Sequence, residues 1–308
     1  MDLVCYIPSY ENSLLVCESV ASARGLPCVV VDNGSLPEHM KRLEALAESS
    51  CGQVTLIHHA RDLGRLANWE FCLEHFRQSD RIWLKWLFAG DLLLPGAAEA
   101  LQAAERAFPE ARMIAAGFLH IQAERRMLLR PAEHLKLYSP ADSLVRTARE
   151  GNWFGPPSAW CLHREAVVEG CRFGSLPWSA DLALAAEVAV RWPVAAQPRP
   201  VVEFHADRRM HYRCYVGTVG SLLQEGLVRE ESLRSWAPHI LTPSLAKRTR
   251  NDCEGTVAVQ VLVAALRQVG LLGLVVAGIR LAARRVWRAT IARRLAGRLP
   301  VRSTTNRR

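Results

Sequence analysis

The sequence predicts an α/β protein whose central sheet is mostly parallel. Short apolar runs of strand length alternate with longer runs of helical periodicity between residues 2 and 107. Some strand-like runs, such as Val29-Val30-Val31, are apolar on both faces, which is typical of strands covered by helices on both sides. The alternation favours right-handed crossovers between parallel strands. We therefore expect a parallel sheet flanked by helices.

Proline and glycine separate the expected elements. Pro8 follows the first strand, Gly25 and Pro27 end the first helix, and Pro95 precedes a later helix at its first position. In chain order, we expect strand 2–7, helix 11–24, strand 28–31, helix 37–48, strand 54–57, strand 82–88, helix 97–107 and helix 181–190.

Polar residues follow three of these strands, at Ser9-Tyr10, Asp32 and Asp91. The carboxyl ends of parallel strands meet at one sheet edge, where open α/β sheets bind ligands. Each motif alone has a second interpretation: Asp91 fits a turn cap equally well, and Asp32-Asn33-Gly34-Ser35 fits an ordinary turn. The convergence of all three predicts a ligand site at this edge.

Composition excludes several classes of protein. The chain has 308 residues, half of them hydrophobic, enough for one large α/β domain or two modest ones. Its nine cysteines form no CxxC pair and no Cys/His cluster at metal-ligand spacing, which favours a reducing compartment and argues against structural zinc. No signal peptide is expected, because Met1 leads directly into a strand. The sequence contains neither a GxGxxG motif after the first strand nor a P-loop lysine. A dinucleotide site and a phosphate-cradling site are therefore disfavoured.

The net charge of +9 is concentrated at the end of the chain. Residues 280–308 contain ten arginines and no acidic residue, so residues 1–279 carry about −1. Residues 279–308 place apolar side chains opposite the arginines, as in a helix that lies on an anionic membrane surface. A core helix pair with a solvated end also fits these residues. Because residues 1–279 are nearly neutral, nucleic acid is an unlikely partner. We expect a cytoplasmic protein that is peripheral on the inner face of the membrane.

An ordered set of motifs carries a family resemblance over about residues 3–210. Tyr6–Asn12 (YIPSYEN) and Val29–Ser35 (VVVDNGS) resemble the opening of family 2 glycosyltransferases, which have the GT-A fold. The later segments that resemble this family are Asp62–Arg65 with Asn68-Trp69 and Cys72-Leu73, Leu87–Pro95, Gly155–Ala159, Trp178–Asp181 and Phe204-His205.

The resemblance implies an inverting glycosyltransferase of surface polysaccharide synthesis. Such an enzyme moves a sugar from a UDP-, GDP- or dTDP-sugar to a glycan or lipid-linked acceptor. Asp181 stands where the family has its catalytic base, which accepts the proton of the acceptor hydroxyl. The other implied roles are donor binding by Pro8, Tyr10, Asp32, Arg65 and Asn68, divalent metal (Mg²⁺ or Mn²⁺) binding by Asp91 and His205, and acceptor contacts by Trp153, Ser158 and Trp178.

One position departs from the family pattern. The metal-binding aspartate of the family stands five residues before the proline, and here Gly90 occupies that place, with Asp91 after it. Metal binding would therefore use Asp91 with shifted geometry, or metal dependence is weakened or lost. This departure supports an alternative function, a non-catalytic GT-A-like module that binds a sugar nucleotide or a partner.

The expected domain organisation follows the motifs and the composition. We predict a GT-A domain over 1–210, a helical connector packed on it over 211–254, apolar and amphipathic helices over 255–300, and a disordered tail over 301–308. Within 255–300, two apolar runs are each too short to span a bilayer core of ~30 Å.

Overall fold

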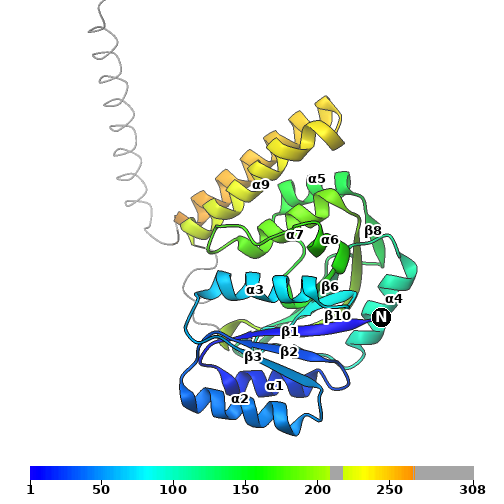
Figure 1. The fold of residues 1–308 in the computed structure, drawn as a ribbon. Helices are drawn as coiled ribbons and strands as arrows, with labels where there is room; N and C mark the ends of the chain where they lie inside the picture. Colours follow the sequence, from blue (N-terminus) through cyan, green and yellow to red (C-terminus); the bar gives the residue numbers. More distant parts are fainter. Residues whose placement is uncertain (209–217, 266, 268–308) are drawn as a thin grey trace, which may run out of the picture. The chain divides into compact units, whose positions relative to one another are not determined.

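The computed structural model describes residues 1–208, 218–265 and 267, and its described part contains a ten-stranded sheet with helices on both faces (Figure 1). The strands are β1 (Leu3–Ser9), β2 (Cys28–Asp32), β3 (Val54–His58), β4 (Trp83–Trp86), β5 (Leu92–Leu93), β6 (Met113–Gln122), β7 (Arg125–Leu129), β8 (Lys136–Tyr138), β9 (Trp160–His163) and β10 (Val194–His205).

The sheet is mixed, with one dominant strand direction. Its order is β3-β2-β1-β4-β9-β6-β10-β5, with β7 beside β6 and β8 beside β10. The strands β1, β2, β3, β4, β6 and β10 run one way, whereas β5, β7, β8 and β9 run the other way. The predicted mostly parallel α/β fold is confirmed. The antiparallel strands, which the periodicity did not reveal, pair mainly around β6 and β10.

The helices are α1 (Ser13–Ser22), α2 (Pro37–Ser49), α3 (Arg65–Gln78), α4 (Ala97–Ala107), α5 (Pro140–Glu150), α6 (Arg164–Val168), α7 (Ala180–Arg191) and α9 (Val219–Ile240), and residues 243–265 are also helical. Those predicted at 11–24, 37–48, 97–107 and 181–190 correspond to α1, α2, α4 and α7, with end shifts of at most two residues.

Alternating side chains of the strands form two cores. In β1, Cys5 and Ile7 pack with α1, α2 and α4 on one face of the sheet. Val4 and Tyr6 pack with α3, α6 and α7 on the other face. Figure 1 shows α1 and α2 on one side of the strands and α3 and α7 on the opposite side. This burial on both faces explains why the strands are apolar throughout.

The segment after β4 is held in place by a buried lysine. Lys85 is 0% exposed, and its Nζ donates to the backbone carbonyls of Trp86 (3.2 Å) and Ser158. Burial lowers the pKa of Lys85 because the charged form loses its hydration. The lysine thus ties the end of β4 to the 3₁₀ turn η1 (Pro157–Ala159).

The described residues form two compact units, of which the first is Met1–Ala258 and the second begins at Val259. Within the first unit, a small core joins α5, α7 and α9 through Leu144, Val190 and Leu233. No helix in the described ranges is both long enough and apolar enough to cross a membrane. The segment 279–308, on which the membrane-surface prediction depends, lies outside the described residues.

Candidate active site

Two cavities in the first unit share one wall. A cavity of about 480 Å³ lies at the carboxyl ends of β1 and β2 and is here called the strand-end cavity. A second cavity of about 400 Å³ is bounded by α7 and α9 and is called the helix-side cavity. Arg65, Trp69 and Phe88 line both of them. A ligand could therefore extend from one cavity into the other past these three side chains.

The strand-end cavity brings together four of the five predicted donor-binding residues, Pro8, Tyr10, Arg65 and Asn68. Tyr10 is 45% exposed, so its ring is accessible to a ligand. Asn68 is buried and its Nδ2 donates to the carbonyl of Val31 at 3.2 Å, which fixes the start of α3 against β2. The strand ends that the sequence predicted to converge do line one cavity, but of the polar residues expected there only Ser9 and Tyr10 line it.

Asp32, the fifth predicted donor residue, is not among the residues lining the cavity. It is 0% exposed, and its carboxylate accepts hydrogen bonds from the Ser35 N–H (2.9 Å) and the Ser35 hydroxyl (2.6 Å) and lies 3.1 Å from His58 Nδ1. The carboxylate therefore stabilises the turn after β2. The next residue, Asn33, lines the cavity instead and accepts a hydrogen bond from the Leu63 N–H.

The two predicted metal ligands lie close together in the chain's fold but do not form a ligand set. Asp91 is 0% exposed, and its Oδ1 accepts a hydrogen bond from the backbone N–H of His205 at 3.2 Å. The His205 ring instead lies against Glu203, with 3.3 Å between Nε2 and Oε2. Across the described residues, no group of three or more His, Cys, Asp or Glu side chains could hold an ion. These side chains do not by themselves fit a divalent cation.

Gly90, the position that departs from the family pattern, has a backbone φ of +90°. Residues with a Cβ rarely adopt this conformation, so the turn between β4 and β5 favours glycine. A Cβ built there would lie 3.4 Å from Leu15 and 3.5 Å from Arg208, which is ordinary van der Waals contact, so the constraint comes from the backbone conformation. The local backbone gives a physical reason for the absence of an acidic side chain at this position.

Asp181 lies at the start of α7 and lines the helix-side cavity. Its Oδ1 accepts a hydrogen bond from the Leu182 N–H at 2.9 Å. Burial raises the pKa of Asp181, while this hydrogen bond and the positive charge of Arg65 oppose the rise. A carboxylate with a raised pKa beside a cavity has the properties of a general base.

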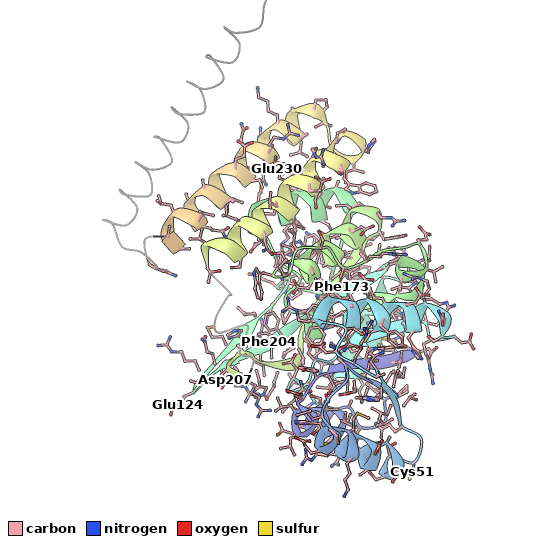
Figure 2. All side chains as sticks on the ribbon, turned by 60° about the vertical axis from the view of Figure 1, so that its left-hand side comes forward. Cys51, Glu124, Phe173, Phe204, Asp207 and Glu230 are labelled. Carbon is pink, nitrogen blue, oxygen red and sulfur yellow. The ribbon has the colours of Figure 1, made fainter. Side chains whose placement is uncertain are left out.

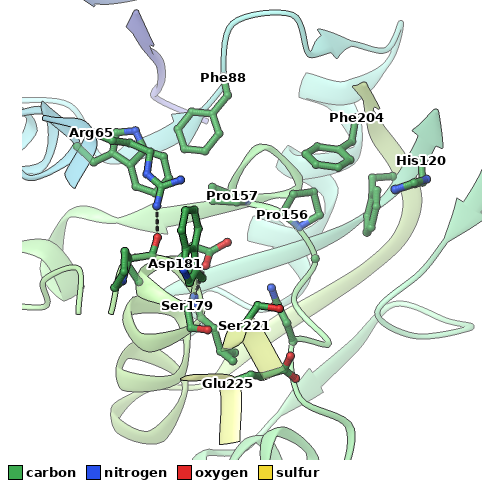
Figure 3. A pocket seen from close by; sticks show the side chains of 18 of the residues that line it. Arg65, Phe88, His120, Pro156, Pro157, Ser179, Asp181, Phe204, Ser221 and Glu225 are labelled. Carbon is green, nitrogen blue, oxygen red and sulfur yellow. Dashed lines mark hydrogen bonds between the residues drawn. The ribbon is translucent and has the colours of Figure 1, made fainter. Parts of the chain in front are cut away.

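Arg65 stands at the junction of the two cavities (Figure 3). Its guanidinium carbon lies 5.1 Å from the centre of the Trp69 ring and 5.4 Å from that of the Trp178 ring. Its Nη2 donates to the carbonyl of Pro177, the hydrogen bond drawn in Figure 3. A planar cation clamped between two rings is well placed to bind an anionic group that reaches both cavities.

The three predicted acceptor residues lie in different places. Trp178 lines the helix-side cavity beside Asp181. Trp153 lines a smaller neighbouring cavity and donates from Nε1 to the Thr147 hydroxyl at 3.0 Å. Ser158 is 0% exposed, and its hydroxyl accepts a hydrogen bond from the Phe88 N–H at 3.1 Å. The structure therefore gives Ser158 a part in fixing the segment after β4.

Several residues of the helix-side cavity carry no motif. Ser221, Leu222 and Glu225 come from α9, and Figure 3 shows Ser221 and Glu225 at the side of the cavity where Ser179 lies. Glu225 forms an ion pair with Arg229, which is 0% exposed. The spacing of 221, 222 and 225 marks one helix face, but no sequence signal places that face against α7.

The architecture defines the class of protein: a GT-A fold. No protein-family model matches the chain, and no curated protein sequence matches it. Among solved structures, S. aureus TarS in complex with UDP-GlcNAc aligns with 88% of this chain and 77% of its own, with a TM-score of 0.67 and 9% identity. The mannosyltransferase PcManGT from Pyrobaculum calidifontis, in complex with GDP-Man and Mn²⁺, aligns with 94% of this chain and 82% of its own (TM-score 0.55, 15% identity). The predicted GT-A fold is confirmed.

Proposed function

We propose that this protein is a nucleotide-sugar-dependent glycosyltransferase. The observation that carries the proposal is the pair of cavities joined at Arg65, with strand-end residues such as Tyr10 and Asn33 on one side and Asp181 on the other. Fold alone does not define an activity. TarS and PcManGT, which are structurally similar, are in complex with UDP-GlcNAc and with GDP-Man, which supports a sugar nucleotide as the donor.

In the proposed reaction, the nucleotide occupies the strand-end cavity and the sugar extends past Phe88 towards Asp181. The acceptor hydroxyl enters from the helix-side cavity, loses its proton to the Asp181 carboxylate and attacks the anomeric carbon. The new carbon–oxygen bond forms as the bond to the diphosphate breaks, and the diphosphate leaves with the electron pair. Attack opposite the leaving group inverts the anomeric configuration.

Arg65 would bind the diphosphate, because it lines both cavities and carries a fixed positive charge. The cation also favours the ionised form of Asp181, which is the form that accepts a proton. A divalent cation, Mg²⁺ or Mn²⁺, would have to obtain most of its ligands from the donor phosphates and water, since the described side chains do not form a set. No step above depends on it.

The finer assignments are part of the same proposal. The acceptor is a glycan or a lipid-linked sugar of surface polysaccharide synthesis, in line with the resemblance to family 2. The protein would be cytoplasmic and would attach to the inner face of the membrane through 279–308. Asp32, His205, Trp153 and Ser158 keep their proposed roles only if ligand binding rearranges the surroundings described above.

The first test is a screen of UDP-, GDP- and dTDP-sugars by thermal shift, with and without Mn²⁺. A donor present at 100 times its dissociation constant should stabilise the protein by ~2.7 kcal/mol, enough to rank the nucleotides. Hydrolysis or transfer of the best donor is then measured with the parent protein and with Asp181→Asn. If no donor stabilises the protein, the proposal is wrong.

A second candidate function is a non-catalytic module that binds a sugar nucleotide. It is favoured by the burial of Asp91 and by the backbone conformation at position 90, which favours glycine over an acidic residue. This module would bind a donor in the thermal-shift screen and show the same slow donor breakdown in the parent and in Asp181→Asn. Faster donor turnover by the parent excludes it.

A further inference from the structure

A third cavity continues the helix-side cavity away from Arg65. It has a volume of about 240 Å³ and is here called the distal cavity. Phe118, Leu129, Asn152 and Gly155 line both it and the helix-side cavity, so the two form one continuous depression. An acceptor bound next to Asp181 can therefore extend into the distal cavity.

One arginine of the distal cavity is held rigidly by aromatic rings. The guanidinium carbon of Arg146 lies 4.5 Å from the centre of the Trp153 ring and 5.2 Å from that of Tyr138. Its Nε donates to the Glu150 carboxylate at 2.8 Å, and its Nη1 donates to the Tyr138 hydroxyl at 3.0 Å and to the backbone carbonyl of Pro131. Its Nη2 has no hydrogen bond to any described residue. The guanidinium group of Arg146 is thus preorganised and still has the N–H donors of Nη2 available for a ligand.

A second arginine at this cavity has no charged partner among the described residues. Arg130 directly follows β7, is exposed, and forms no ion pair with a residue that the structure describes. Figure 2 shows the β6–β7 hairpin that leads to it, with Glu124 at the far end. The charged lining consists of Arg130, Arg146 and Glu150, so the cavity has a formal charge of +1. Because Glu150 already pairs with Arg146, the unmatched charge lies on the arginine side.

The aromatic surface of the distal cavity is not available for stacking. Trp153 is 8% exposed, and its ring contacts Arg146, Tyr138 at 5.0 Å and Phe154 at 4.2 Å between centres. A neutral sugar ring would find no free face of this tryptophan to lie on. Specific recognition of a polar ligand in the cavity therefore falls to its arginines and Asn152 and not to stacking on Trp153.

From these contacts we propose that the distal cavity binds an anionic group, a phosphate or a carboxylate, on the acceptor. This group belongs to the building block of the acceptor that is next to the one carrying the reacting hydroxyl. Arg130 and the free Nη2 of Arg146 would donate to its oxygens, and Asn152 lies at the entrance from the helix-side cavity. That the anionic group is part of an acceptor rests on the proposed function, whereas the anion site itself does not.

The test uses the full-length chain labelled with 5-fluorotryptophan and monitored by ¹⁹F NMR. The resonances of Trp153 and Trp178, which report on the distal and helix-side cavities, are assigned with Trp153→Phe and Trp178→Phe. Inorganic phosphate, glucuronate and glucose are titrated separately. We expect phosphate, glucuronate or both to shift the Trp153 resonance, and the stronger of the two identifies the anion.

Arg130→Gln removes a charge from an exposed side chain, so the variant should fold normally. It should weaken anion binding at Trp153 about tenfold, as expected for one charge-assisted hydrogen bond. The matched control is Arg125→Gln, which replaces an exposed arginine of β7 that does not line the cavity, and this variant should bind like the parent.

The proposal is overturned if no anion shifts the Trp153 resonance, if only Trp178 responds, or if glucose binds as well as the anions. It is also overturned if Arg130→Gln and Arg125→Gln behave alike. Because the readout is binding, these outcomes are independent of sugar transfer. A protein that transfers no sugar but binds anions at Trp153 would disprove the proposed activity and leave the anion site standing.

Discussion

The strand-end and helix-side cavities share Arg65, Trp69 and Phe88 but are built in different ways. The strand-end cavity is formed by the end of β1, by the turns that follow β1, β2, β3 and β4, and by α1 and α3, all within the first ninety residues, with Arg208 as its distant member. The helix-side cavity combines residues between 65 and 225, from both ends of the fold. One is a product of sheet topology, and the other depends on how later helices pack.

This difference has a functional consequence if our proposal is right. A cavity made by adjacent strand ends can change little without disturbing the sheet, which suits a nucleotide common to many donors. A cavity closed by α9 can change with the helix face that lines it. We therefore expect substitutions in the strand-end cavity to affect the donor, and substitutions in the helix-side cavity to affect the transfer step and the acceptor.

The largest expected effect comes from Asp181→Asn. The substitution keeps the shape of the side chain and removes its ability to accept a proton. Transfer should fall by ~10²-fold or more, while donor affinity in the thermal-shift assay stays within about twofold of the parent. An unchanged rate would place the base elsewhere and would remove the functional distinction between the two cavities.

The next effect concerns the turn at Gly90. Gly90→Asp restores the acidic residue of the family but forces a side chain into φ +90°. We expect the free energy of unfolding, measured in urea, to fall by about 1–3 kcal/mol. Gly90→Ala is the matched control, because it carries the same backbone cost without a carboxylate.

Added Mn²⁺ should raise the melting temperature of Gly90→Asp more than that of Gly90→Ala if the new carboxylate can hold an ion. A Gly90→Asp protein as stable as the parent would contradict the assignment of a glycine-specific backbone at this turn.

A smaller effect is expected for Tyr10→Ala in the strand-end cavity. Tyr10 is exposed and its ring can stack on the nucleotide base, an interaction of about 1–3 kcal/mol. Donor affinity, measured by calorimetry, should fall about tenfold, and Tyr10→Phe should retain most of it. If Tyr10→Ala instead changes acceptor affinity at unchanged donor affinity, the donor does not bind where we place it.

The difference between the two cavities also explains which parts of the fold and of the site could be predicted from the sequence. The sheet and the position of Tyr10 at a strand end could be predicted, because strand alternation and polar strand ends are local signals, whereas Arg65 and Asn68 were implied by the family resemblance alone. The burial of Asp32 could not, since it depends on which side chain of the turn bonds to Ser35. The contribution of Glu225 could not either, because helix packing across some 160 residues of sequence leaves no periodic signal.

The smallest effect we expect is a shift in the titration of Asp181 when Arg65 is replaced. Burial raises the pKa of this carboxyl group, and Arg65 opposes the rise less strongly than the Leu182 N–H does; Glu225, from α9, adds to the rise. Arg65→Gln removes a positive charge that favours the carboxylate, so the pKa should move further up and the ionised base should form only at higher pH. The measurement is ¹³C NMR of the aspartate carboxyl groups, with Asp181→Asn for assignment, and Arg65→Lys should restore most of the parent value. A shift to lower pH, or none, would show that Arg65 does not couple the two cavities electrostatically, and they would then act as separate binding sites.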